Sequence, residues 1–317
     1  MSATDVQQIE GLKAEQTQCQ ALLSDEELSE LFEKYGVVDK RKRKLVVRIF
    51  FWLMVFTAGE PSRRGSLLQL IGFFIGALVI LYPEKEIMSL SKTAVSNRLQ
   101  GVSWYLFRGV YNHLLEKYKT ILGAKERKFL DRFKDAVAVD GSVIGLSRKL
   151  EKVFASVHNG KSSLKLNTKY SLKIEAVTKI QVTSGKRHDS RFAFVTKEAG
   201  LLYLIDLGYW SFKLMKKIID VGSFFVMRLK SSCDPLITAV TQADYQHLLG
   251  KRLSEISDFL QSHTDCGQID LTVQLSTAKK PRFQEDVRLV GLFHEGEWRF
   301  SIPSPLRVDE GKVAQSE

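Results

Sequence analysis

Two short stretches of sequence decide the fold: AVAVDGS at residues 136–142 and LLYLIDLGY at residues 201–209. Each contains a brief apolar run followed by an aspartate, Asp140 or Asp206, with a glycine close behind. Runs of this kind predict buried central strands, and the glycines predict where the strands stop. A carboxylate at such a place is costly to desolvate unless it is paired or binds a metal. The pattern therefore predicts two acids that point to one cation site over neighbouring strand ends.

Asp140 and Asp206 are accordingly the candidate metal ligands and catalytic residues. Clustered carboxylates hold the divalent metals that activate and stabilise oxygens at phosphorus, so the pair favours phosphoryl-transfer chemistry. Without a cation, like-charge repulsion between two facing carboxylates is expected to raise the pKa of one of them. A structural interpretation stays open, because Asp-Gly is a common turn signal and strand-end aspartates often cap the next helix.

The composition of the 317 residues bounds the class of protein. The length predicts two domains, or one domain with a large insertion. A net charge of +11 favours a polyanionic partner, nucleic acid first, with a role in solubility as the alternative. Cys19, Cys233 and Cys266 show no C-x-x-C spacing, which argues against a disulfide framework or a zinc site and fits a reducing cytoplasm. The polar segment 1–20 is not expected to be a signal peptide.

Residues 1–130 are predicted to be helical and to bind DNA. Ser24 to Glu27 form a capping-box pattern that opens a helix over 27–35, which Gly36 ends. The segment 89–99 predicts a short helix, either a recognition helix in a DNA groove, with Arg98 as a contact, or a plain bundle helix. A basic run before residue 45 predicts salt-dependent contacts with phosphate. Its residues are Lys40, Arg41, Lys42 and Arg43.

Two apolar segments, 45–56 and 67–82, raise the question of a membrane. A spanning helix needs about 20 apolar residues, and both segments are shorter. Buried helices of a soluble bundle therefore explain them better, and a membrane hairpin is the alternative.

From residue 135 the pattern changes to strands. Strands are predicted over 136–144, 163–174, 175–183, 201–205 and 224–230, with a short helix opening at 188–190 and a longer one over 210–221. This order of elements is ribonuclease-H-like. Further strands over 267–276, 286–293 and 297–302 have the character of a β-rich insertion. The predicted class is therefore α+β: a helical region 1–130, a ribonuclease-H-like mixed sheet 131–231, a β-rich insertion 232–302 and a disordered tail 303–317.

With these motifs in place, the chain resembles the insertion-sequence transposases of the DDE type, which carry a β-rich insertion in a ribonuclease-H-like core. Asp140-Gly141-Ser142 matches the first acid motif, and Asp206-Leu207-Gly208-Tyr209 matches the second, where Leu207 replaces a common arginine. Three further segments match in the family's order. They are 91–99, 185–190 and 224–230.

The resemblance implies metal-dependent DNA cleavage and strand transfer, with Asp140 and Asp206 binding Mg²⁺ or Mn²⁺. The implied partners are the double-stranded DNA of the element ends and of the target, with a homodimer on DNA and a cytoplasmic, nucleoid-associated location. The family's third acid lies in a Tyr-x2-Arg-x3-Glu-x6-Lys helix, and no such spacing follows Ser231. The third catalytic acid is thus not identifiable, and the chain is interpreted as a truncated or frameshifted copy with impaired catalysis. A non-catalytic DNA-binding remnant is the alternative.

Three residues near the acid motifs are candidate DNA contacts. Arg228 and Lys230 form an Arg-x-Lys pair that leaves a predicted strand, so they favour contact with DNA phosphate, and a solvated strand end is the alternative. His188 is expected either to position a phosphate or to have a structural role.

Overall fold

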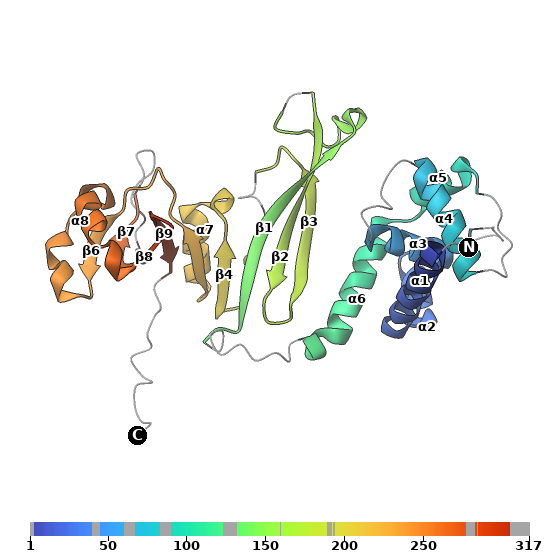
Figure 1. The fold of residues 1–317 in the computed structure, drawn as a ribbon, viewed down its shortest axis with the longest axis horizontal. Helices are drawn as coiled ribbons and strands as arrows, with labels where there is room; N and C mark the ends of the chain where they lie inside the picture. The colour runs from blue at the N-terminus through green and yellow to red at the C-terminus, as the bar shows by residue number, and fades with distance from the viewer. Residues whose placement is uncertain are drawn as a thin grey trace, which may run out of the picture. The chain divides into compact units, whose positions relative to one another are not determined.

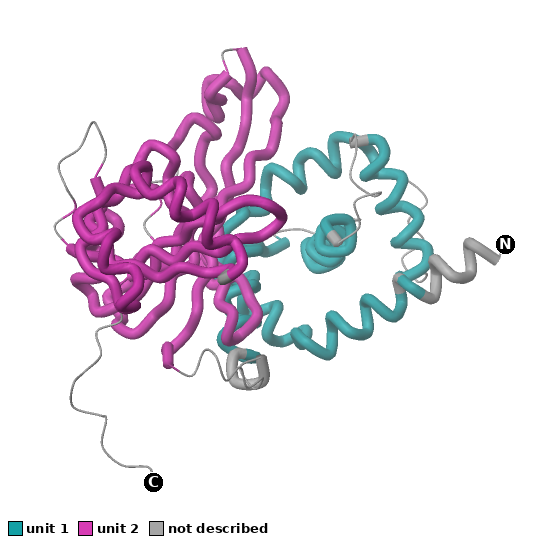
Figure 2. The backbone as a smooth tube through the Cα atoms, turned by 60° about the vertical axis from the view of Figure 1, so that its left-hand side comes forward, with its two compact units in different colours: residues 1–119 teal, residues 120–317 magenta. Residues whose placement is uncertain are grey.

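The computed structural model describes residues 3–39, 45–59, 67–82, 90–122, 132–158, 160–188, 192, 194–276, 283 and 285–304. It contains two compact units, Met1–Lys119 and Thr120–Glu317, coloured separately in Figure 2. Each unit has its own hydrophobic core. Helices fill the first unit and a large mixed sheet forms the second (Figure 1), so the predicted α+β class is confirmed.

Unit 1 is built from helices that pack around aromatic and aliphatic side chains. The helices are α1 (Ala3–Leu22), α2 (Asp25–Lys34), α3 (Val47–Gly59), α4 (Leu67–Leu81), α5 (Lys92–Gly101) and α6 (Trp104–Leu122), whose last turn passes the unit boundary. The rings of Phe50 in α3 and Phe74 in α4 meet edge to face with centroids 5.9 Å apart, and both are buried. Within the described part of the chain, no helix combines the length and the apolar character that crossing a bilayer requires.

The start of α2 follows the capping pattern in the sequence. The Ser24 hydroxyl accepts a hydrogen bond from the Glu27 N–H, and the Glu27 carboxylate accepts one from the Ser24 N–H. Gly36 has a φ of +66°, a left-handed conformation that suits glycine and ends the helix. The carboxylate of Glu27 also accepts from Lys117 and contacts His113, which ties α2 to α6. The bond from Lys117, then those from Ser24 and His113, lower the pKa of Glu27 to about 2.

Unit 2 contains one sheet with the strand order β3-β2-β1-β4-β5-β9-β8-β7-β6. The strands are β1 (Asp135–Leu146), β2 (Ser162–Ser171), β3 (Ala176–Ser184), β4 (Leu201–Ile205), β5 (Phe224–Arg228), β6 (Leu236–Val240), β7 (Gln268–Gln274), β8 (Asp286–His294) and β9 (Glu297–Pro303). β1, β4 and β5 are parallel to one another, and the other neighbouring pairs are antiparallel. The strands after β5 therefore extend the same sheet through β9.

The core of unit 2 lies on one face of the parallel strands. Val139, Ile205 and Met227 occupy matching positions on β1, β4 and β5, and all three are buried. Helix α7 (Phe212–Asp220) contributes Met215 and Ile218 to the same cluster. Because side chains alternate between the two faces of a strand, the residues next to these three point to the opposite face.

The end of β1 differs from the sequence prediction. The glycine signal predicted a strand end at Gly141 and the strand pattern predicted an end at residue 144, but β1 continues to Leu146. The reason is that β2 goes on pairing with β1, from Thr168 opposite Asp140 to Ser162 opposite Leu146, after the parallel partner β4 has ended. The pairing with β2 therefore sets the length of β1.

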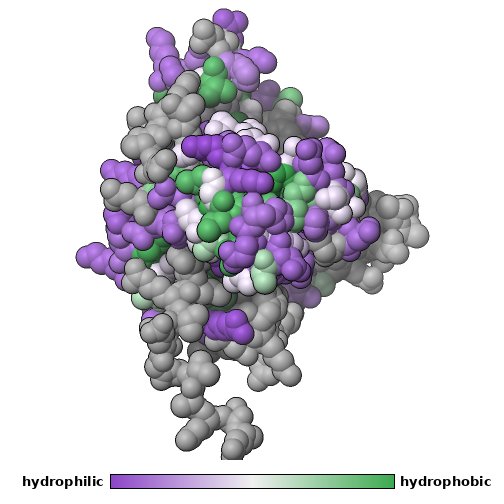
Figure 3. All heavy atoms as spheres, turned by 90° about the vertical axis from the view of Figure 1, so that its left-hand side faces the viewer, coloured by the Kyte–Doolittle hydropathy of each residue, from purple (hydrophilic) through white to green (hydrophobic). Residues whose placement is uncertain are grey.

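Three further comparisons concern unit 2. The predicted strands after residue 230 are found as β7, β8 and β9, whereas β6 and the short helix α8 (Ser257–Ser262) were not predicted. The face that carries α8 and β6 shows mostly hydrophilic side chains around a smaller hydrophobic area (Figure 3). Residues 189–191 of the predicted short helix and residues 305–317 of the predicted tail lie outside the described residues.

Candidate active site at the ends of two parallel strands

Asp140 and Asp206 occupy neighbouring positions in the sheet. Val139 of β1 lies opposite Ile205 of β4 in parallel register, and each aspartate is the next residue along its strand. Val139 and Ile205 point into the core, so both aspartates point to the other face. Their side chains are exposed, and the cost of burying a carboxylate that the sequence suggested does not arise. The two strands thus present a pair of accessible carboxylates at the end of β4.

Arg228 joins this pair from the third parallel strand. Ile205 lies opposite Met227 of β5, so Arg228 follows at the level of Asp206. The Arg228 guanidinium donates a hydrogen bond to Asp206 Oδ1 over 2.8 Å, and the two side chains are 70% and 51% exposed. This bond, followed by the backbone N–H of Leu207, holds the pKa of Asp206 below its ordinary value. The pKa of Asp206 therefore shifts downward rather than upward, because Arg228 supplies a positive charge beside it.

The carboxylates fit a hard divalent cation in their chemistry, because carboxylate oxygens are the ligands that Mg²⁺ and Mn²⁺ take in proteins. Asp206 is held ionised, and Asp140 Oδ1 accepts from the Gly141 N–H over 2.7 Å. Among the described residues, no cluster of three or more His, Cys, Asp or Glu side chains gathers anywhere. The described site therefore provides two carboxylates, and a third acid is not identified in it.

Comparison with known proteins identifies this core. Residues 131–282, which contain both aspartates and Arg228, match the family model of the transposase DDE domain. Over these residues the chain is similar to the transposase DDE domain. The resemblance drawn from the acid motifs is confirmed.

Two individual proteins show the extent of the similarity. The chain is 27% identical over 217 residues to the transposase for insertion sequence element IS231B of Bacillus thuringiensis subsp. berliner, a match that covers 64% of this chain and 41% of that relative. The chain thus spans less than half the length of the curated relative that it matches. Among solved structures, a piggyBac transposase synaptic complex with hairpin DNA aligns with a TM-score of 0.39 and 11% identity, covering 94% of this chain and 61% of that one.

The candidate DNA contacts near Asp140 and Asp206 have exposed side chains. Arg228 ends β5, and Lys230 follows two residues later with its side chain exposed. His188 is exposed after the end of β3. The structure therefore places all three on the surface of unit 2, while Lys40, Arg41, Lys42 and Arg43 lie outside the described residues.

Arg98 has a different environment. It lies in α5, which begins after the N-cap Ser91 and packs into unit 1 through the buried Val95. Its guanidinium donates to Asp39 Oδ1 and to the carbonyl of Leu45, each over 2.5 Å, and the side chain is 11% exposed. Because these contacts use the guanidinium inside unit 1, we leave Arg98 out of the proposed DNA contacts.

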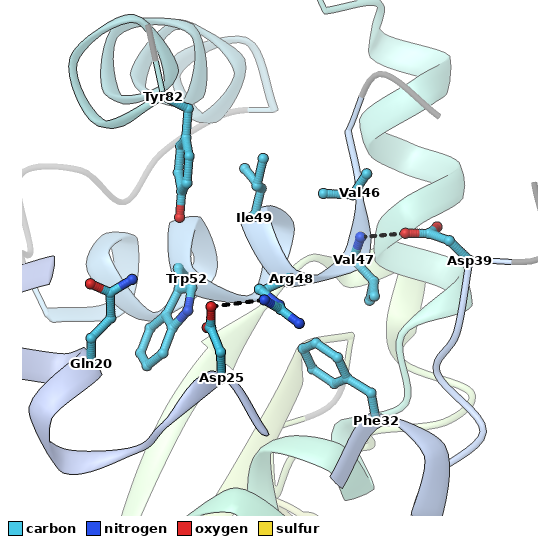
Figure 4. Close-up of a pocket in the computed structure, with 10 residues that line it drawn as sticks. All are labelled: Gln20, Asp25, Phe32, Asp39, Val46, Val47, Arg48, Ile49, Trp52 and Tyr82. Carbon is cyan, nitrogen blue, oxygen red and sulfur yellow. Dashed lines mark hydrogen bonds and ion pairs between the residues drawn. The ribbon is translucent and has the colours of Figure 1, made fainter. Parts of the chain in front are cut away.

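Unit 1 also contains a cavity that the sequence did not indicate. It measures about 460 Å³ and is drawn in Figure 4. Trp52 and Tyr82 line it, together with the ion pair between Arg48 and Asp25, whose atoms lie 2.8 Å apart. The buried Trp52 Nε1 has no hydrogen-bond partner in the described part of the chain. The lining residues come from well-separated segments, so no local motif marks the cavity.

Proposed function

We propose that this chain acts on double-stranded DNA as the transposase of an insertion sequence, with Asp140 and Asp206 as the ligands of a divalent cation, Mg²⁺ or Mn²⁺. The observation that carries the proposal is the register of β1 and β4, which places two exposed carboxylates side by side within a DDE domain. The net charge of +11 supports a polyanionic substrate. A homodimer on DNA, in the nucleoid of the cytoplasm, is part of the same proposal.

A bound divalent cation would supply Lewis-acid activation of the phosphodiester and of the attacking oxygen. The chain's own residues would prepare the place for this chemistry. Val139 and Ile205 fix the spacing of the two strands by packing into the core. Asp206 stays ionised because Arg228 lowers its pKa. Since this ion pair is well exposed, it is weak, and Arg228 can exchange Asp206 for a DNA phosphate at little cost.

Replacing Arg228 with glutamine tests this exchange. We expect Arg228→Gln to tighten the binding of Mn²⁺, measured by calorimetric titration, because the guanidinium no longer competes for Asp206. An exposed ion pair is worth about 0.2–1 kcal/mol, which corresponds to a gain of up to roughly fivefold in affinity. Arg299→Gln is the matched control, since Arg299 on β9 forms a similar exposed pair with Glu295 in the turn before that strand. An unchanged or weaker affinity of Arg228→Gln for Mn²⁺ would show that the Arg228 guanidinium and the metal do not compete for Asp206.

Binding to DNA should depend strongly on salt. With about six or more phosphate contacts, affinity for a DNA duplex should fall by at least roughly 10³-fold between 50 and 200 mM salt, because counterions are released on binding. Fluorescence anisotropy with a labelled duplex measures this directly. A flat salt response, or no binding at low salt, would contradict a DNA partner.

A non-catalytic DNA-binding protein is the second candidate, favoured by the finding that the described site holds only two carboxylates. Nicking of supercoiled plasmid DNA in the presence of Mn²⁺ separates the two candidates. Nicked product that disappears in Asp140→Asn supports catalysis. Salt-dependent binding without nicking supports the DNA-binding remnant.

A further inference from the structure

The three strands β1, β2 and β3 form a ribbon that extends beyond the level of Asp140 and Asp206. β4 ends at Ile205, opposite Val139, while β1 continues from Asp140 to Leu146 against β2. β3 accompanies β2 as far as Ser184, which lies opposite Leu164. The ribbon therefore projects about 20 Å past the aspartates, at roughly 3.3 Å per residue. Figure 1 shows the three strands rising well above β4.

The far end of this ribbon is held in place by backbone hydrogen bonds. The connection from β1 to β2 begins with a short 3-10 turn, Arg148–Leu150, and returns through a bridge between Ala155 and Ser162. The Lys186 N–H donates to the Ala155 carbonyl over 2.9 Å, which fastens the residues after β3 onto this connection. Basic side chains from both segments are therefore brought to the same end of the ribbon.

These side chains form a surface that we name the ribbon tip. It consists of six exposed cations: Arg148, Lys149, Lys152, Lys161, Lys186 and Arg187. Over the described residues 146–158, 160–163 and 184–188, Glu151 is the only carboxylate, and its Oε1 accepts from the Gly160 N–H over 3.1 Å. No ion pair involving the six cations is found among the described residues. The ribbon tip thus concentrates positive charge that the described part of the chain does not neutralise.

We propose that the ribbon tip binds the phosphate backbone of the DNA whose cleavage site lies at Asp140 and Asp206. The inference rests on the proposed function and adds a second contact surface, about 20 Å along the ribbon from the aspartates. Asp140, Ser142 and Ile144 alternate onto one face of β1, so a duplex that reaches Asp140 on this face runs beside the ribbon towards its tip. Phosphate is the ligand that uncompensated lysine and arginine side chains recognise without sequence preference.

A second copy of the chain is the competing occupant of this surface. Val153 and Val157 are 69% and 68% exposed between the cations and offer apolar area to a protein. A symmetric dimer through the ribbon tip, however, would place two strongly positive patches against each other, which is costly. Charge complementarity therefore favours DNA.

The test compares two variants with the same change in charge. The tip variant carries Arg148→Gln, Lys149→Gln, Lys152→Gln and Lys186→Gln. The control variant carries Lys197→Gln, Lys213→Gln, Lys217→Gln and Lys251→Gln, which are exposed in unit 2 outside the ribbon tip. The affinity of the full chain for a labelled duplex is measured over a range of salt concentrations. We expect the tip variant to reduce the slope of log K against log salt by about 3.6, since each of the four lost phosphate contacts removes about 0.9, and the control variant to change it by less than about 1.

The outcomes separate the inference from the proposed function. Wild-type binding with a tip variant that keeps the wild-type slope overturns the inference and leaves the function standing. Failure of the wild type to bind DNA overturns both. Loss of self-association in sedimentation, with an unchanged slope, assigns the ribbon tip to a second copy and also overturns the inference. If the fourfold variant does not fold, Lys149→Gln and Lys186→Gln are measured singly, each with an expected reduction of about 1.

Discussion

Asp140→Asn and Asp206→Asn should each abolish the rise in melting temperature that Mg²⁺ or Mn²⁺ gives to the wild-type chain. A metal that binds only the folded state stabilises it by about 2.7 kcal/mol at a free concentration one hundred times its Kd. The register of β1 and β4 makes the two carboxylates partners in one site, so the loss of either removes half of the described ligands. Thermal unfolding followed by circular dichroism, with and without metal, measures the effect.

Without metal, the Asp140→Asn and Asp206→Asn variants should differ from each other in stability. Asp206→Asn breaks the ion pair with Arg228 and should lower stability slightly, by less than about 1 kcal/mol because the pair is exposed. Asp140→Asn has no such partner to lose among the described residues and should leave metal-free stability nearly unchanged. Asp265→Asn, an exposed aspartate beyond α8, is the control and should keep the full response to metal. A metal response that survives both active-site substitutions would place the cation elsewhere.

Local sequence patterns predicted the elements that carry the site. The apolar runs 136–139 and 201–205 became β1 and β4, and the capping box at Ser24 fixed the start of α2. These signals are short-range: alternation or burial within one strand, and hydrogen bonds within one turn. The juxtaposition of Asp140 with Asp206 also follows from them once the two strands are taken as parallel neighbours.

The remaining features depend on pairing between distant segments. Gly141 is an acceptable residue within a strand because β2 continues past it, and nothing local to AVAVDGS contains that information. The contact between Arg228 and Asp206 requires the register of β5 against β4. Arg98 is a charged residue, but its guanidinium donates to Asp39 and to the carbonyl of Leu45, more than fifty residues earlier. Tertiary contacts of this kind override local propensity.

The second acid motif has a structural part that the sequence left unexplained. After Asp206, the residues Leu207–Tyr209 form a 3-10 turn, and the ring of Tyr209 is buried against Phe194 with centroids 5.7 Å apart. The Tyr209 hydroxyl donates to Asn167 Oδ1 over 3.0 Å, and Asn167 is also buried. Asn167 lies opposite Gly141 on β2. This hydrogen bond therefore ties the turn after one aspartate to the strand pair that carries the other.

Tyr209→Phe should consequently lower the free energy of unfolding by about 1–3 kcal/mol, because it leaves the buried Asn167 carbonyl oxygen without this donor. Urea unfolding followed by circular dichroism measures the change. Tyr170→Phe, on the same strand as Asn167 but 36% exposed, is the matched control and should cost less than about 0.5 kcal/mol. Combining Tyr209→Phe with Asn167→Leu should recover part of the loss, since both polar partners are then replaced by apolar groups. A cost for Tyr209→Phe no greater than that of the control would show that the hydrogen bond does not hold the turn.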